Sequence, residues 1–556
     1  MKHFISAILK ILNRKEKIKL GMLILFDFVI GILDVAFLGM LLVVINFYTN
    51  NLSPLKLTFL PDALLNKNSL MLAGLFFLLF SIKNWFGYLG SKSQHHFFYD
   101  VASRLSKRNI LKYLKDNYTN FVNIDSSVQI RKISHLPIEF SHYILTNFQQ
   151  VVSQIILIFF TICAILFYHP TIFLLLFLLL TPPVVALAWF IRKKLKDAHI
   201  HTKIAGEKTI QHLQESLSGY VESNIYHKND FFVDRYYGFQ RQLNDNIATQ
   251  HTLQSLPSRL MEIFAVLGFF ILVAVNKWSA NGLAIDLFTI GVFVAASYKI
   301  IPGVVKILNC AGQMKTYRFT LNDLLSRNDT TQATGNVIPA GNINSLKFEN
   351  VHFKYKDHTV LNHVNLHMEP GDFAGISGSS GKGKTTVVNL LLGFLEPDYG
   401  AIYLNSKITD GFERRRYWYK ISYVKQQPFF IYDSILKNIT LSDDHHDRER
   451  LEEVLSFCGI DQFLDKYPEG LEKIITENGK NISGGQRQRI MLARALYHDF
   501  DLLILDEPFG EMDDLSENRI LVQLKLLAQQ GKMILFITHN KASLSFCNKI
   551  FSLDEE

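Results

Sequence analysis

The feature that most constrains the fold of this 556-residue chain is a set of apolar windows in its N-terminal part, each long enough to cross a bilayer as a helix. The windows lie near residues 20–45, 69–91, 145–168, 171–191, 259–277 and 285–303. They are apolar on all sides, whereas a helix at the surface of a soluble domain keeps one polar face. We therefore predict a helical transmembrane domain with six spans.

The distribution of lysine and arginine predicts the orientation of these spans. Basic residues are frequent before the first span, after the second and after the fourth, whereas the opposite loops hold only Lys56, Lys67 and Lys277. Cytoplasmic loops carry the excess of Lys and Arg in membrane proteins. We expect a multi-pass membrane protein with both termini in the cytoplasm, in a bacterial inner membrane. The basic start of the chain is expected to form an amphipathic helix on the inner surface rather than a signal peptide.

The cytoplasmic stretches, roughly 92–144 and 192–258, show helical periodicity with polar faces. We expect them to continue the membrane helices into the cytosol and to turn back near Asn120–Ser127 and Ser218–Asn229. A cytoplasmic domain could contact the chain at these turns.

From about Ser345 the pattern changes to alternating strands and helices, which predicts an α/β domain. Residues 378–385 read GSSGKGKT and match the phosphate-binding pattern GxxxxGK[ST] between an apolar strand and a helix. We assign residues 1–315 to the transmembrane domain, 316–344 to a linker and 345–556 to a P-loop nucleotide-binding domain.

In such a loop, backbone N–H groups converge on the phosphates at a helix N-terminus. Lys384 is expected to contact the β- and γ-phosphate oxygens, and the Thr385 hydroxyl suits Mg²⁺. The other expected nucleotide contacts from this loop are Gly378, Ser379, Ser380, Gly381, Gly383 and Thr386.

Two further strands are predicted to end in catalytic side chains. The apolar run LLILDEP ends in Asp506, placed to hold Mg²⁺, and in Glu507, placed to polarise the attacking water. The run MILFITH brings His539 to the same edge, where its imidazole would contact the γ-phosphate.

The stretch NISGGQRQR at residues 481–489 resembles the signature motif of ATP-binding cassette (ABC) transporters, with Ile482 where leucine is usual. Six spans followed by one cassette resemble a half-transporter of the ABC exporter type. The resemblance implies that Tyr355 stacks on adenine, that Gln426 links Mg²⁺ to the transport domain, and that Asp513 is the D-loop aspartate. It also implies ATP contacts from Ser483, Gly484, Gly485 and Gln486 across the interface of a dimer. We therefore expect ATP and Mg²⁺ as cofactors and a homodimer with two composite ATP sites, with a heterodimer as the alternative.

Other classes of protein fit less well. Six apolar spans exclude a soluble ABC ATPase acting on nucleic acid, and the fused cassette favours export over import. An ATP-gated channel on the same scaffold can dispense with the hydrolytic glutamate, which is present here as Glu507. The expected function is ATP-driven export or flipping of an amphipathic substrate.

Charged residues inside the predicted spans offer a candidate substrate cavity formed by Asp27, Asp34 and Lys83. The alternative, which we favour, is a structural role, for example an ion pair between Asp34 and Lys83 or a water-lined wall. A weaker resemblance to lipid-linked oligosaccharide flippases favours a lipid-linked saccharide or a lipid as substrate, with an exported peptide or a drug as the alternative.

Overall fold

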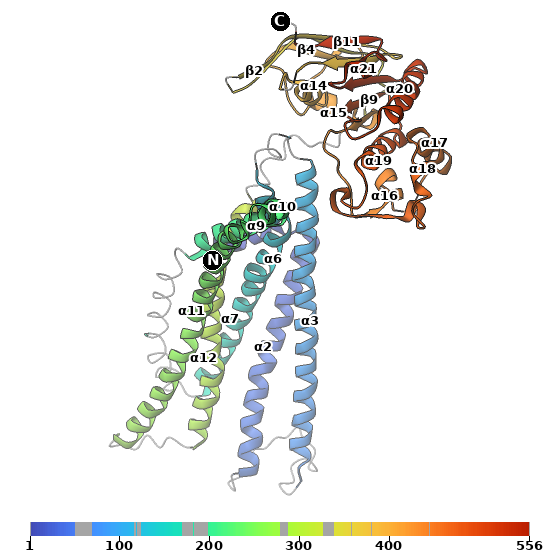
Figure 1. Cartoon of the computed structure of the whole chain (residues 1–556). Coiled ribbons are helices and arrows are strands. Elements are labelled where there is room, and N and C mark those ends of the chain that lie inside the picture. Colours follow the sequence, from blue (N-terminus) through green and yellow to red (C-terminus); the bar gives the residue numbers. More distant parts are fainter. Residues whose placement is uncertain are drawn as a thin grey trace. The chain divides into compact units, whose positions relative to one another are not determined.

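The computed structural model describes residues 2–49, 69–115, 118, 124–168, 182, 198–278, 287–325, 339–356, 358–379, 381–443 and 445–554. The chain divides into two compact units, which Figure 1 colours from blue to green and from yellow to red. The first comprises Met1–Asp116 and Asn123–Ala333, and the second comprises Asn117–Val122 and Thr334–Glu556. A short segment from early in the sequence thus belongs to the C-terminal unit.

The described part of the first unit is helical. Its long helices are α2 (Arg14–Thr49), α3 (Met71–Leu114), α7 (Asn147–Tyr168), α9 (Ala198–Ser218), α11 (Asn229–Trp278) and α12 (Leu287–Thr316). Short elements join or precede them: α1 (Lys2–Ile11), α5 (Ser126–Ile130), η2 (Arg131–His135), α6 (Leu136–Glu139), η3 (Phe140–Thr146), α10 (Tyr220–Ile225) and α13 (Arg318–Leu325). Helix α7 packs against α2 and α12, and α9 packs against α11.

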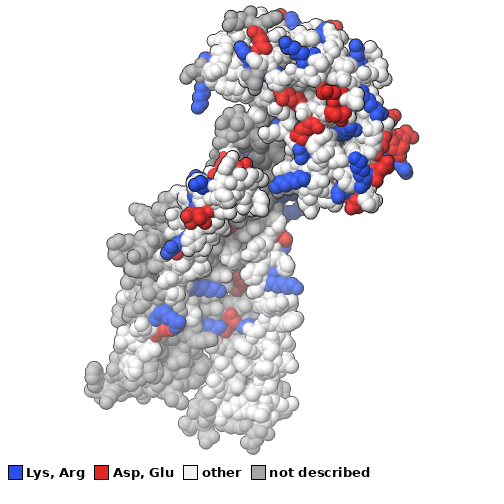
Figure 2. Space-filling model, viewed as in Figure 1, with Lys and Arg blue, Asp and Glu red and all other residues white. Residues whose placement is uncertain are grey.

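Apolar side chains cover the outside of these helices. Phe86 projects away from α3 and is 53% exposed, and charged side chains are sparse along the lower part of this unit in Figure 2. Such a surface is stable in lipid, not in water. Among the described residues, three helical stretches are long and apolar enough to span a membrane: Arg14–Ile45, Met71–Leu114 and Ser126–Leu166. The predicted spans at 259–277 and 285–303 fall on α11 and, from Leu287, on α12, and the one at 171–191 lies outside the described residues except for Pro182.

The end of this unit that holds α1 and α13 has a compact core. Phe97 and Leu105 of α3 are buried against Leu136 and Phe140, while α1 inserts Ile8. Helix α13 adds Leu321 and Leu324 to the same cluster, although it lies inside the range 316–344 that the sequence assigns to a linker. The apolar face of α13 explains this packing, because a free linker would leave both leucines in water.

Of the two predicted helix turns, the one at Ser218–Asn229 coincides with a break between helices, and the one at Asn120–Ser127 lies partly outside the described residues. Helix α3 ends at Leu114, and α5 begins at Ser126 with the Asp125 carboxylate accepting a hydrogen bond from Ser127 N at 2.8 Å. Helix α9 ends at Ser218 and α11 begins at Asn229, with the short α10 between them.

The second unit is built on a parallel sheet in the order β11-β3-β10-β9-β6. Its strands are β3 (Phe373–Ser377), β6 (Ile421–Val424), β9 (Leu502–Asp506), β10 (Met533–Ile537) and β11 (Lys549–Ser552). An antiparallel sheet in the order β2-β1-β4-β5 adjoins it, with β1 (Leu346–Tyr355), β2 (His358–Met368), β4 (Tyr399–Leu404) and β5 (Lys407–Ile408), and a third, two-stranded sheet pairs β7 (Asp433–Ser434) with β8 (Ile474–Ile475).

Both faces of the parallel sheet are buried, which explains the continuous apolar runs in its strands. Leu502 and Ile504 of β9 pack in one core with the antiparallel sheet and α14 (Lys384–Leu391). Leu503 and Leu505 pack in a second core with a helical lobe. The lobe contains α16 (Ile435–Thr440), α17 (Arg448–Cys458), α18 (Asp461–Leu464) and α19 (Gly484–Tyr497), and α20 (Asp514–Gln529) packs on β3 and β10 (Figure 1).

Candidate nucleotide-binding site

The site lies at the edge where the parallel strands β3, β10, β9 and β6 end. Residue Ile537 at the end of β10 pairs with Ile376 of β3 on one side and with Asp506 of β9 on the other. Parallel strands deliver their C-terminal residues to one edge of a sheet, which is where ligands bind in open α/β folds. The segments that follow these strands carry the phosphate loop, Glu507 and His539.

The phosphate loop connects β3 to α14 and depends on glycine for its shape. Gly381 and Gly383 have φ values of +86° and +89°, a region that L-residues avoid. A Cβ on Gly383 would also lie 2.7 Å from Leu361 Cδ2, so only glycine lets the loop pack on β2 at this point. Thr385 is exposed and Thr386 is buried at the start of α14, and Ser380 lies outside the described residues.

Lys384 is the first residue of α14, and its side chain is buried. Its Nζ donates to the carbonyl of Gly378 at 2.7 Å and lies 3.0 Å from His539 Nε2. The ammonium is therefore held inside the loop by the loop's own carbonyl, in reach of the residue that follows β10. A phosphate entering the loop would find this cation already in place.

Glu507 is fixed from two sides. Its carboxylate accepts a hydrogen bond from Gln426 Nε2 at 2.8 Å and lies 2.9 Å from His539 Nε2. Its backbone N–H donates to Ile537 O at 2.9 Å, and its φ is +51°, a left-handed conformation that costs free energy in any residue with a Cβ. This bend turns Glu507 away from the direction of β9. Two other predicted site residues, Gln426 and His539, contact its carboxylate there.

Asp506 precedes this bend and is buried at the end of β9. The Tyr423 hydroxyl donates to its Oδ2 at 3.3 Å. Burial raises the pKa of Asp506, and the neighbouring Glu507 adds to that effect. A buried carboxylate with few hydrogen bonds and a raised pKa is suited to a cation, which would restore its charged form. The donor set of Asp506, Gln426 and the Thr385 hydroxyl is one that Mg²⁺ accepts when phosphate oxygens and water complete the octahedron.

The signature stretch forms the N-terminus of α19 in the helical lobe. Ser483 caps the helix, since its Oγ accepts from Gln486 N at 3.4 Å and its N–H donates to Gln486 Oε1 at 3.0 Å. A Cβ on Gly484 would fall 1.6 Å from Glu511 Oε2, and Glu511 also binds Arg487 at 2.8 Å. The described hydrogen bonds of this stretch go to the lobe, to Glu511 and to Ser516 of α20, and none of them reaches the phosphate loop. A ligand at this end of the 14-residue helix would meet the N–H groups of Gly484 and Gly485, for which the described structure records no hydrogen bond, at the positive end of the helix dipole.

The remaining predicted contacts lie elsewhere on the unit. Tyr355 ends β1, is 48% exposed and packs edge-on against Phe353. Asp513 caps α20 through a hydrogen bond from Ser516 N at 2.9 Å, and hydrogen bonds from Ser516 lower the pKa of Asp513. In the described structure Asp513 therefore has a structural role as a helix cap.

A second feature of the unit is an aromatic contact with the segment 117–122. The Tyr118 ring stacks on Phe394, with the centroids 4.6 Å apart, and Phe394 also contacts Trp418 at 5.3 Å. This is one of the turns at which the sequence predicted contact with a cytoplasmic domain.

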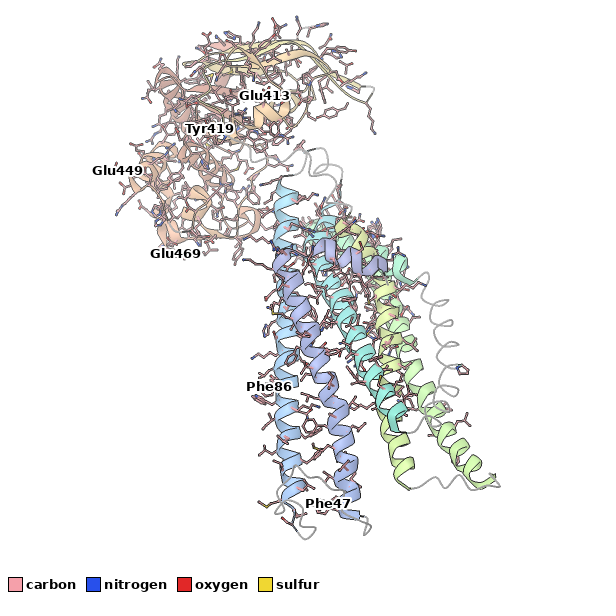
Figure 3. All side chains as sticks on the ribbon, turned by 180° about the vertical axis from the view of Figure 1, so that it is seen from behind. Phe47, Phe86, Glu413, Tyr419, Glu449 and Glu469 are labelled. Carbon is pink, nitrogen blue, oxygen red and sulfur yellow. The ribbon has the colours of Figure 1, made fainter. Side chains whose placement is uncertain are left out.

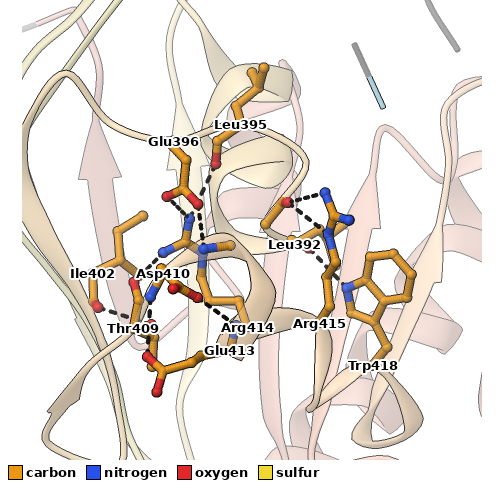
Figure 4. Close-up of polar contacts among 12 residues, drawn as sticks. Leu392, Leu395, Glu396, Ile402, Thr409, Asp410, Glu413, Arg414, Arg415 and Trp418 are labelled. Atoms are coloured by element: carbon orange, nitrogen blue, oxygen red, sulfur yellow. Dashed lines mark hydrogen bonds and ion pairs between the residues drawn. The ribbon is translucent and has the colours of Figure 1, made fainter. Parts of the chain in front are cut away.

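Figure 4 shows the polar network that holds the chain around Phe394. Arg414 is almost fully buried, and its guanidinium donates to Glu396 at 2.8 Å and to Leu395 O at 3.2 Å. Trp418 Nε1 donates to Leu392 O at 2.9 Å. Side chains of residues 414–418 thus donate hydrogen bonds to the backbone carbonyls that follow α14. These bonds fix the backbone on both sides of Phe394.

Sequence reasoning missed Asp554, next to the phosphate loop. Its carboxylate accepts hydrogen bonds from Ser379 N at 3.1 Å and from Ser379 Oγ at 2.8 Å. These bonds, with Lys382 and Lys384 nearby, lower the pKa of Asp554. The signal available in the sequence was the acidic LDEE that follows the strand β11, paired in register with β3.

The charged residues of the predicted membrane cavity already have partners. Lys83 forms an ion pair with Asp34, and both side chains are largely buried. Asp27 accepts hydrogen bonds from Gln94 and Gln149, each at 2.6 Å. The structural ion pair that the sequence left as an alternative is therefore present.

Comparisons with known proteins agree with this geometry. Residues 361–510 match the family model described as ABC transporter. The chain is 35% identical over 215 residues to an ATP-dependent lipid A-core flippase of Cupriavidus metallidurans, and 29% identical over 231 residues to a "Probable ABC transporter ATP-binding/permease protein" of Haemophilus influenzae. These alignments cover 38% and 42% of this chain and only 36% and 42% of the two relatives.

The fold of the whole chain is also known. It matches the structure of a bacterial Atm1-family ABC exporter with ATP bound, with a TM-score of 0.78 and 16% identity, over 97% of this chain and 93% of the other. The predicted fold class, a helical exporter-type domain followed by an α/β cassette, is confirmed. The chain therefore carries an ATP-binding cassette of the ABC transporter family, joined to a helical unit with the fold of an ABC exporter.

Proposed function

We propose that this protein exports or flips an amphipathic molecule across a membrane and that ATP hydrolysis drives the movement. The observation that carries this proposal is the Glu507 carboxylate, held by Gln426 and His539 beside the phosphate loop at the edge of the sheet. That arrangement is one for hydrolysis, since a fixed carboxylate next to bound phosphate can polarise a water molecule.

Each residue would have a distinct part in the reaction. Lys384 and the N–H groups of the loop bind the β- and γ-phosphates, and Asp506, Gln426 and Thr385 would hold Mg²⁺, which neutralises charge on the phosphate oxygens. Glu507 orients the attacking water and accepts its proton, while His539 contacts the γ-phosphate and fixes Glu507. Tyr355 would stack on the adenine ring.

Two chains are needed for a complete site. No described hydrogen bond joins the signature residues Ser483, Gly484, Gly485 and Gln486 to the chain's own phosphate loop. A second copy would present them to the γ-phosphate, with Asp513 at the same interface. We therefore infer a homodimer with two composite ATP sites, and a partner with a similar sequence is the alternative.

For the substrate we favour a lipid-linked saccharide or a lipid. Two relatives that are 35% and 33% identical to parts of this chain are named ATP-dependent lipid A-core flippase. The helical unit is also apolar outside while carrying polar groups inside. A peptide or a drug is the alternative substrate. The orientation we propose places both termini on the cytoplasmic side of a bacterial inner membrane.

Reconstitution tests the function directly. Liposomes containing the full-length protein and a fluorescent lipid-linked saccharide should show ATP-dependent movement of the label between leaflets, detected by a membrane-impermeant quencher. Glu507→Gln liposomes should show no movement. Transport of a peptide with no movement of any lipid would contradict the lipid assignment, and equal movement with and without ATP would contradict the function itself.

A further inference from the structure

Residues of α7, α11 and α12 in the first unit line a pocket of about 420 Å³. The charged residues Asp27, Asp34 and Lys83, which the sequence offered as a candidate cavity, are not part of its lining. We propose that this pocket binds the head group of the transported molecule and that the head group is anionic and rich in hydroxyls, as in a phosphorylated saccharide. This inference rests on the transport function proposed above and adds a binding site and a chemical class to it.

The wall of the pocket is unusually polar for a contact between membrane helices. Asn147 and Gln150 of α7 face Asn309 and Gln313 of α12. The spacings of three and four residues place each pair on one side of its helix. Asn147 Nδ2 donates to Gln313 Oε1 at 2.7 Å, and Cys310 Sγ donates to Gln150 Oε1 at 3.3 Å. Among the residues that the structure describes, the Asn309 amide has no such partner.

Carboxamides both donate and accept hydrogen bonds, so they match hydroxyl groups, which do the same. An apolar ligand would bury the Asn309 amide without a hydrogen-bond partner among the described residues, at a cost in free energy. The amide content of the pocket therefore favours a ligand with many hydroxyls over a purely apolar drug.

The charges of the pocket favour an anion. Glu262 contributes a carboxylate, but Arg259 offsets it one helical turn away, at 3.7 Å. Lys306 is exposed and forms no ion pair with any described residue, although its charge acts on Asp27 of α2. An ammonium that forms no direct ion pair with a described residue and lies beside hydrogen-bond donors is suited to binding phosphate.

Polarity also changes along the pocket. Ile301, Pro302 and Val305 form its apolar part, and the polar residues follow further along α12, from Lys306 to Gln313. A head group at the polar part would leave an attached chain beside the apolar part and the lipid-facing surface. The pair Asp34–Lys83 offers no such site, because each charge already neutralises the other.

Lys306→Gln tests the role of the ammonium, and Lys315→Gln is its matched control. Lys315 is also exposed on α12, but it lies nine residues further on, which places it on the opposite side of the helix. Binding would be measured without ATP on full-length protein in nanodiscs, with a radiolabelled polyprenyl-diphosphate-linked saccharide and with an uncharged glycolipid that carries the same sugar.

We expect Lys306→Gln to weaken binding of the diphosphate lipid roughly tenfold, as loss of one charge-assisted hydrogen bond does. Binding of the uncharged glycolipid should change little, and Lys315→Gln should behave as wild type. Asn309→Asp replaces the amide with a carboxylate of nearly the same shape. This substitution should weaken binding of the diphosphate lipid more than binding of the uncharged glycolipid.

The proposal would be overturned if Lys306→Gln and Lys315→Gln weakened binding of the diphosphate lipid equally. It would also be overturned if Lys306→Gln changed the binding of both lipids to the same extent. Another outcome is a wild-type protein that hydrolyses ATP and transports a substrate that the Lys306→Gln and Asn309→Asp variants bind normally. That result would contradict the role of the pocket in binding and would leave the transport function supported. A wild-type protein without ATP-dependent transport of any substrate would instead contradict the function on which the pocket rests.

Discussion

Under the proposed function, single residues at the end of β9 are expected to decide whether the cassette can hydrolyse ATP. Glu507 adopts a left-handed backbone conformation and is held by Gln426 and His539. The strand and the two carboxylates could be predicted from LLILDEP, because an apolar run ending in charge indicates a buried strand that reaches the surface. The bend could not be predicted, since it depends on the hydrogen bond from Glu507 N to Ile537 on the neighbouring strand.

Glu507→Gln should lower ATP turnover by about 100-fold or more, because the amide cannot accept a proton from water. Nucleotide binding should remain, since the phosphate loop is untouched. Phosphate release and equilibrium binding of a fluorescent ATP analogue measure the two effects. Glu453→Gln, an exposed glutamate of α17, is the control. Turnover near wild type in the Glu507 variant would show that this carboxylate does not activate the water.

Asp554 accepts hydrogen bonds from Ser379 of the phosphate loop, and we expect it to compete with phosphate there, so Asp554→Asn should raise ATP affinity several-fold. Protonation should have the same effect as the substitution. The pKa of Asp554 is lowered in the folded protein by its bonds to Ser379, so its contact with the loop persists above its usual pKa and is lost as the pH falls through the lowered value. The affinity difference between wild type and Asp554→Asn should therefore be constant near neutral pH and shrink in acid.

Isothermal titration across this pH range checks the prediction, with Glu453→Gln again as the control. A variant with unchanged or lower ATP affinity would mean that Asp554 stabilises the loop without competing for it. Sequence reasoning could not find this residue because Ser379 and Asp554 are far apart in the chain and meet only when β11 pairs with β3.

At the scale of elements, the parallel sheet accounts for most of what the sequence revealed. The loop after β3, the carboxylates after β9 and His539 after β10 come together because parallel strands end at one edge. The amides of α7 and α12 gave no comparable signal. Each is an ordinary polar residue in its own helix, and they form a pocket only because these two helices pack together.

The Tyr118–Phe394 contact should couple substrate binding in the helical unit to ATPase activity in the cassette. Phe394→Ala removes the stacked ring without touching the phosphate loop, so basal ATPase activity should stay within about twofold of wild type. Stimulation of ATPase activity by transported substrate should fall several-fold. Tyr399→Ala, which removes an exposed aromatic ring from the same unit, is the control. Undiminished stimulation in Phe394→Ala would exclude this route of coupling.

At the scale of the whole molecule, we propose that a second chain brings its signature helix to the phosphate loop, since no described hydrogen bond joins the two within one chain. The sequence predicted this arrangement only through a family resemblance, because composition and periodicity do not reveal which copy contributes a residue. The apolar helical unit was predicted from the residues alone, since a helix that is apolar on every side is stable only in lipid. The number of six spans stays a prediction, because three helical stretches among the described residues are long and apolar enough to span a membrane.

Mixing two inactive variants tests the composite sites. Ser483→Arg blocks the signature side, and Lys384→Ala weakens the phosphate side. A mixed dimer retains one intact site, so ATPase activity should reappear on co-reconstitution at a clear fraction of wild type, while each variant alone stays near background. Size measurement by native mass spectrometry should give a dimer. A purified chain that remains monomeric and inactive until a different protein is added would contradict the homodimer.

The placement of residues 117–122 in the second unit also has a consequence for how this protein is made. Tyr118 leaves the ribosome long before its stacking partner Phe394 exists, so the cassette cannot acquire its full surface until the first helices have been synthesised and inserted. A cassette expressed by itself from Thr334 onward would present the bare ring of Phe394 to solvent. Such a fragment should be prone to self-association, and a short tyrosine-containing peptide copied from residues 117–122 should keep it in solution.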